Sequence, residues 1–149
     1  MIYFEDLEVG RETVFGDYDV TREEVLEFAT KYDPQPFHLS DEAAAKTHFG
    51  RLAASGWHTA AMTMAVIVRA LTEQRQAGLG SPGVDELRWL KPVYPGDRLT
   101  VRGTILDKTP SRSKPDIGSF RTMTIVANQD GVDVMRFTST VLIRRRPAA

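Results

Sequence analysis

A carboxylate and an imidazole stand five positions apart in the segment Asp33-Pro34-Gln35-Pro36-Phe37-His38. Such a pair can divide the base and acid roles in adding or removing one water. To share that water the two groups must converge to roughly 6 Å, whereas five extended residues span about 17 Å. Because each proline fixes its own φ and favours an extended preceding residue, we predict a non-helical loop of reduced conformational freedom. For the two side chains to share a water, this loop must bend.

Helices are predicted on both sides of this loop. Thr21 to Glu24 has the spacing of a capping box, and apolar residues recur at helical spacing from Val25 to Tyr32, so a helix should run up to Asp33. A short helix should begin at Ser40, whose first turn is acidic, and end near Phe49-Gly50.

A third predicted helix begins at Ser55-Gly56 and runs from Trp57 toward Gln76. Its first half is apolar on nearly every side, which is typical of a helix buried on most sides. We therefore expect it at the centre of the fold.

The rest of the chain has the residue pattern of β-strands. Apolar and polar residues alternate in 99–105 and 135–143, further strands are predicted at 84–90, 120–127 and, more weakly, 13–18, and Asp130-Gly131 is typical of a hairpin turn. Consecutive strands with short turns favour an antiparallel sheet, so the fold class is α+β, with the sheet curled around the central helix. One sheet edge would be unpaired, which favours dimerisation.

The composition excludes several classes of protein. The 149 residues fit a single domain, 1–149, and a net charge of −1 gives no global attraction to nucleic acid or anionic lipid. Without cysteine there are no disulfides, and the three histidines lack metal-ligand spacing, so we expect no metal and no cofactor. No apolar run is long enough to span a membrane, and no signal peptide is recognisable, which favours the cytoplasm.

The chain resembles the MaoC-like dehydratases, a family that includes (R)-specific enoyl-CoA hydratases and has the hotdog fold. Three landmarks carry the resemblance, in the family's order along nearly the whole chain. They are the Asp–Pro–His segment 33–38, the Phe49-Gly50 pair with the small-residue stretch up to Gly56, and a strand that runs into a Pro-Val-x-x-Gly-Asp turn, Arg88-Trp89-Leu90-Lys91-Pro92-Val93-Tyr94-Pro95-Gly96-Asp97.

This resemblance implies reversible addition of water to a trans-2-enoyl thioester, carried by coenzyme A or an acyl carrier protein, to give the (R)-3-hydroxyacyl thioester. It implies that Asp33 is the base for the water and that His38 handles the proton of the α-carbon. Gly56 would supply the oxyanion-hole N–H at the start of the central helix, where unpaired N–H groups favour negative charge. It also implies a homodimer or a dimer-based assembly.

Four further residues are predicted to contact the substrate: Gln35, Phe37, Ser55 and Trp57. Gln35 stands where the family usually has Asn, and the bulky Trp57 lies beside the proposed oxyanion site; core packing is the default for Trp57 and Phe37. For His48 we expect a solvated position, and for His58 a structural one.

Two alternatives to the hydratase remain. A hotdog thioesterase would aim its water at the carbonyl carbon, and a non-catalytic subunit would bind acyl thioesters without turning them over.

Overall fold

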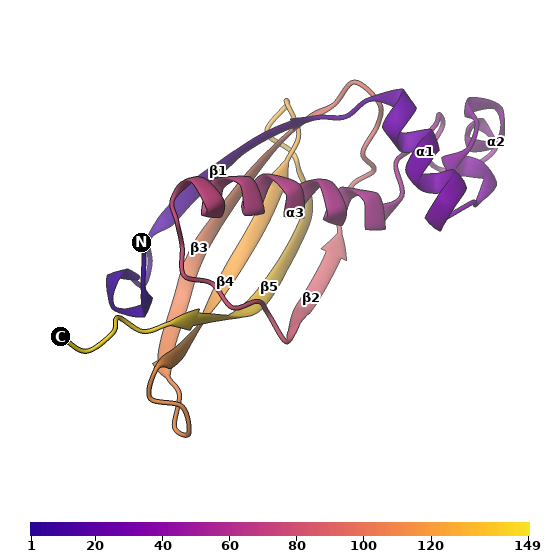
Figure 1. Cartoon of the computed structure of the whole chain (residues 1–149). Helices are drawn as coiled ribbons and strands as arrows, with labels where there is room; N and C mark the ends of the chain where they lie inside the picture. The colour runs from indigo at the N-terminus through magenta and orange to yellow at the C-terminus, as the bar shows by residue number, and fades with distance from the viewer.

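The computed structural model describes all 149 residues as one α+β domain. Five strands form a single sheet and three α-helices precede all but the first of them (Figure 1). The elements are, in order, β1 (Glu12–Asp19), α1 (Arg22–Tyr32), α2 (Asp41–Ala45), α3 (Gly56–Glu73), β2 (Gly83–Trp89), β3 (Arg98–Pro110), β4 (Ile117–Ala127) and β5 (Asp133–Arg144).

The sheet is antiparallel throughout, with strand order β1-β3-β4-β5-β2. The long helix α3 crosses one face of the sheet, and α1 and α2 lie together beyond the end of that helix (Figure 1). All five predicted strands are therefore confirmed, and so is the sheet wrapped around a helix. β2 is an edge strand that pairs with β5 alone.

The core lies between α3 and the sheet. The helix contributes Met62 and Val66, which pack with strand residues such as Leu99, Val126 and Phe137. In β1 a bulge at Gly16, whose φ is +142°, brings the strand close to Val66. This contact holds β1 and the helix together.

The prediction that α3 is buried on most sides is wrong for the single chain. Trp57, Met64 and Val68 are 62%, 49% and 50% exposed on one side of the helix. Met64 and Val68 line an open cavity between the second half of α3 and the sheet, so the sheet does not cover this side of the helix. An apolar stripe is left uncovered.

The start of α1 departs in one detail from the predicted capping box. The Thr21 hydroxyl accepts the Glu24 N–H as expected, but the Glu24 carboxylate accepts the Tyr18 hydroxyl instead of bonding back to the cap. Glu24 therefore fixes α1 to the end of β1.

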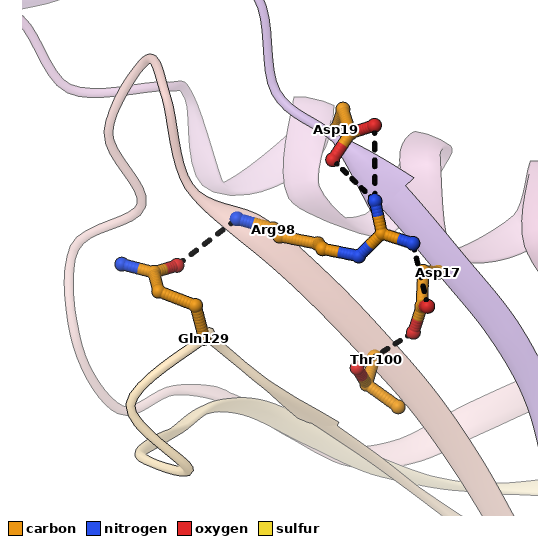
Figure 2. A network of polar contacts seen from close by, with 5 residues as sticks. All are labelled: Asp17, Asp19, Arg98, Thr100 and Gln129. Carbon is orange, nitrogen blue, oxygen red and sulfur yellow. Dashed lines mark hydrogen bonds and ion pairs between the residues drawn. The ribbon is translucent and has the colours of Figure 1, made fainter.

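A polar network secures the same end of the sheet (Figure 2). The Arg98 guanidinium at the start of β3 pairs with Asp17 and Asp19 of β1, each at 3.0 Å, and Thr100 donates to Asp17 at 2.7 Å. Gln129, from the turn between β4 and β5, accepts the Arg98 backbone N–H. These contacts join three strands at the point where the chain leaves β1 for α1.

Two boundaries differ from the predictions. The second helix ends at Ala45 rather than near Phe49, and Pro36–His38, predicted to be non-helical, forms one 3₁₀ turn. Proline is tolerated in the first turn of a helix because its missing N–H would be unpaired there anyway. The segment bends through this turn instead of staying extended.

Candidate active site

The loop after α1 brings Asp33 and His38 together. The Gln35 N–H donates to the Asp33 carbonyl at 2.8 Å, and the His38 N–H donates to the Gln35 carbonyl at 2.9 Å. Two successive tight turns therefore reverse the chain within six residues. His38 Nε2 lies 3.5 Å from Asp33 Oδ2, so the predicted convergence is confirmed.

The orientation of the His38 ring fixes its neutral tautomer. Nδ1 lies 2.7 Å from the Ala53 carbonyl oxygen, which can only accept, so Nδ1 carries the hydrogen. Nε2 is then an acceptor that faces the carboxylate of Asp33. Two acceptors 3.5 Å apart do not bond to each other, and a water that donates one hydrogen to each satisfies both.

Asp33 is held in place as an anion. Partial burial opposes its ionisation, but hydrogen bonds from Ser55 and Gln35, together with the positive charge of His38 when its ring is protonated, hold the pKa of Asp33 below its ordinary value. Ser55 Oγ donates to Oδ2 at 2.7 Å and Gln35 Nε2 donates to Oδ1 at 2.7 Å. Both residues thus orient the carboxylate.

The N-terminus of α3 lies beside this pair. Gly56 is the first helical residue, and the N–H groups of Gly56, Trp57 and His58 have no acceptor within the chain. Such unpaired groups and the helix dipole favour negative charge at this point. The position therefore suits an oxyanion.

The glycine at position 56 has a structural cause that the sequence did not reveal. A Cβ there would collide with the indole ring of Trp89, whose Nε1–H donates to the Gly56 carbonyl at 2.8 Å. Trp89 ends β2, and its contact with Gly56 spans 33 positions of the chain. Nothing local in the sequence signals this contact, although Trp89 lies within the third landmark, Arg88 to Asp97.

A cavity of about 520 Å³ opens onto these groups. Asp33, His38, Gln35, Gly56, Phe37 and Trp57 all line it, together with Thr59, His48, Trp89 and the segment from Leu90 to Val93. Trp57 is exposed rather than packed in the core. Ser55 is fully buried and does not line the cavity; it lies behind Asp33.

The Pro92–Asp97 turn begins at the cavity, which Pro92 and Val93 line. The buried Asp97 carboxylate accepts the Tyr94 N–H at 2.9 Å, and the Tyr94 hydroxyl donates to the Phe49 carbonyl at 2.7 Å. The Val93 carbonyl accepts the Ala54 N–H at 2.8 Å. The second and third sequence landmarks are therefore bonded to each other around the site.

The remaining titratable groups form no second centre here. His48 is exposed at the cavity, and His58 is buried and stacks on Phe28 with ring centroids 4.8 Å apart, as expected for each. No group of three or more His, Cys, Asp or Glu side chains is arranged to hold a metal ion. A larger cavity of about 780 Å³, between the second half of α3 and the sheet, includes neither Asp33 nor His38.

Fold and site together define a hotdog domain with an Asp–His pair at the tip of its central helix. Residues 6–126 match the model of the MaoC like domain, and the chain belongs to that family. No helix of the structure is long and apolar enough to cross a membrane.

Similar proteins agree with this assignment. A MaoC-like dehydratase from Rhodospirillum rubrum is 41% identical and superposes with a TM-score of 0.88 over 99% of this chain and 100% of that one. The 3-hydroxybutyryl-CoA dehydratase of Methylorubrum extorquens is 33% identical over 76% of this chain and 70% of its own. The R-hydratase PhaJ1 from Pseudomonas aeruginosa is 26% identical, with a TM-score of 0.74 over 99% of this chain and 92% of that one.

Proposed function

We propose that the protein reversibly adds water to a trans-2-enoyl thioester and gives the (R)-3-hydroxyacyl thioester. The observation that carries this proposal is the pair of acceptors, Asp33 Oδ2 and His38 Nε2, 3.5 Å apart beside the unpaired N–H of Gly56. The pair suits the activation of a water. The N–H suits the charge that water addition places on the thioester oxygen.

In this mechanism one water donates its two hydrogens to Asp33 and His38. The water oxygen bonds to the β-carbon while one of its protons passes to His38 Nε2. The electrons of the C=C bond move onto the thioester oxygen, where Gly56 N–H stabilises the enolate. The imidazolium then returns the proton to the α-carbon, so hydration consumes one water and leaves the protein unchanged.

This sequence of steps assigns the base role expected of Asp33 to His38. A carboxylate whose pKa is held below its ordinary value is a poor proton acceptor, whereas Nε2 of His38 has a free lone pair in the tautomer that the Ala53 carbonyl selects. Asp33 holds the water and, as an anion, stabilises the imidazolium. The α-carbon proton still passes through His38, as the resemblance implies.

The names of the relatives support the substrate class and the stereochemistry. The Methylorubrum relative is a 3-hydroxybutyryl-CoA dehydratase and the Pseudomonas relative is an R-hydratase. We infer that a coenzyme A thioester of the fatty-acid type is the substrate of this protein and that the hydroxyl enters in the (R) configuration.

We also infer a homodimer. Six of the seven residues of β2 are exposed, its outer edge has no partner strand, and Val84 and Trp89 on it are 50% and 45% exposed. Trp57 of the uncovered α3 stripe packs against Trp89 with ring centroids 5.0 Å apart, and Met64 and Val68 line the same cavity as Val84, so the stripe continues this apolar surface. Pairing with a second copy would cover an edge and a patch that would otherwise promote aggregation.

The experiment is a panel of trans-2-enoyl-CoAs of graded chain length, followed by loss of the conjugated-enone absorbance. We expect hydration of at least one member and an (R) product on chiral analysis. An (S) product would contradict the stereochemistry. Release of free coenzyme A from a saturated acyl-CoA, without hydration of any enoyl substrate, would establish the thioesterase instead.

A further inference from the structure

The hydroxyl of Thr59 is bonded differently from those of the other helical threonines. Thr30, Thr63 and Thr72 each donate to the carbonyl four residues earlier, at 2.7 to 2.8 Å. This is the usual bond of a threonine inside a helix. Thr59 makes no such bond. Only 2% of the residue is exposed, but its hydroxyl oxygen is not fully buried, since His58 Nδ1 is the one fully buried side-chain polar atom without a hydrogen-bond partner.

The free hydroxyl of Thr59 belongs to the catalytic cavity. Thr59 lines the cavity that Asp33, His38 and Gly56 line. It stands three residues after Gly56, hence one turn further along the same side of α3. Because helical side chains tilt toward the N-terminus, its side chain leans back toward the level of Gly56.

We propose that the Thr59 hydroxyl is a second hydrogen-bond donor to the thioester oxygen, beside the N–H of Gly56; this inference rests on the proposed function. Asp33 and His38 offer acceptors to the water and no donor to the substrate. The Thr59 hydroxyl is a free donor in the same cavity, and it suits the thioester oxygen, which becomes negative during the reaction. The thioester oxygen is a weak acceptor in the substrate and a strong one in the enolate. The bond therefore strengthens as the reaction proceeds, and no proton leaves Thr59.

Three variants test this role. Thr59→Val removes the hydroxyl and keeps the branched shape, Thr59→Ser restores it, and Thr63→Val is the matched control. Thr63 is 1% exposed on the same helix and does not line the cavity, and its hydroxyl donates to the backbone carbonyl of Thr59 and not to the Thr59 side chain. Loss of one oxyanion donor costs about 10²–10³-fold in kcat.

With crotonyl-CoA we expect Thr59→Val to lower kcat by that order with little change in KM, and Thr59→Ser and Thr63→Val to retain most of the activity. The infrared carbonyl band of bound butyryl-CoA should lie closer to its free position in Thr59→Val than in the wild type. An unchanged kcat, or a lowered kcat with the wild-type carbonyl band, would overturn the proposal.

The two hypotheses fail in different ways. A wild-type protein that binds butyryl-CoA but hydrates no enoyl thioester would contradict the proposed function alone. The infrared comparison of Thr59→Val with the wild type would still decide whether Thr59 bonds to the thioester oxygen.

Discussion

At the scale of single residues, Ser55 helps to keep the Asp33 carboxylate charged. It is fully buried, and its hydroxyl is spent on Oδ2 of that carboxylate rather than on capping α3. A hydrogen bond to the charged form of an acid lowers its pKa. Burial raises the pKa of Asp33, and the Ser55 bond is the largest of the effects that lower it.

Ser55→Ala should therefore raise the pKa of Asp33. Asp33 would then lose its charge at a higher pH as the solution is acidified, so the titration of its carboxylate, followed by NMR at the side-chain carboxyl carbon, should move to higher pH. At neutral pH, activity should fall less than after loss of Asp33 itself. The measurements are this NMR titration and the rate of crotonyl-CoA hydration at neutral pH.

Ser81→Ala serves as the control, because Ser81 is exposed and bonds only to Gly83. Its Asp33 titration should match that of the wild type. An Asp33 titration that stays in place in Ser55→Ala would show that the Ser55 bond does not set the charge of Asp33.

The sequence predicted Asp33, His38 and Gly56 because residue type and order carry them. It assigned Ser55 and Gln35 to the substrate, whereas both bond to Asp33 in the structure. Short polar side chains next to a catalytic loop have several partners within reach, and only the fold decides which of them is taken.

At the scale of elements, the end of β2 determines the shape of the helix tip. The Trp89 ring fills the space where a Cβ of residue 56 would lie, and its N–H bonds to the Gly56 carbonyl. Glycine is therefore required here by packing between two elements, in addition to any approach of substrate.

Gly56→Ala should displace either Trp89 or the first turn of α3 and lower kcat by about 10²-fold, the order expected for one misplaced oxyanion donor. The double variant Gly56→Ala/Trp89→Ala should regain a large part of that loss, because the added methyl then has room. Kinetics with crotonyl-CoA and thermal unfolding of both variants and of Trp89→Ala make the comparison.

A folded double variant no better than Gly56→Ala would contradict this explanation. It would indicate that the glycine is needed for the substrate itself. Local sequence reasoning found the helix start and missed Trp89, because caps and turns are encoded within a few residues whereas this contact joins a helix to a strand 33 positions away.

At the scale of the whole molecule, α3 is apolar on more of its circumference than a single chain buries. The sequence correctly showed a helix with almost no polar face, but the sheet covers only part of it. The apolar residues of a sequence mark every surface that is buried in the functional assembly, including surfaces that a partner chain covers. The resemblance to a dimeric family and the exposed stripe therefore lead to the same inference.

Val68→Glu should convert the protein from dimer to monomer, because it places a charge in the centre of the proposed interface. Val14→Glu is the matched control: Val14 is 63% exposed on β1, the opposite edge strand of the sheet. Sedimentation velocity at micromolar concentration distinguishes the outcomes. A Val68→Glu protein that sediments like the wild type would exclude this surface as the interface.

The most direct test of the central claim, that Asp33 and His38 activate one water between them, is the rate of crotonyl-CoA hydration by Asp33→Asn. Asparagine keeps the shape of the side chain but removes its charge and turns half of its acceptor capacity into donors. We expect a loss of about 10²–10⁴-fold in kcat in a protein that remains folded. A folded Asp33→Asn protein with full hydratase activity would contradict the account.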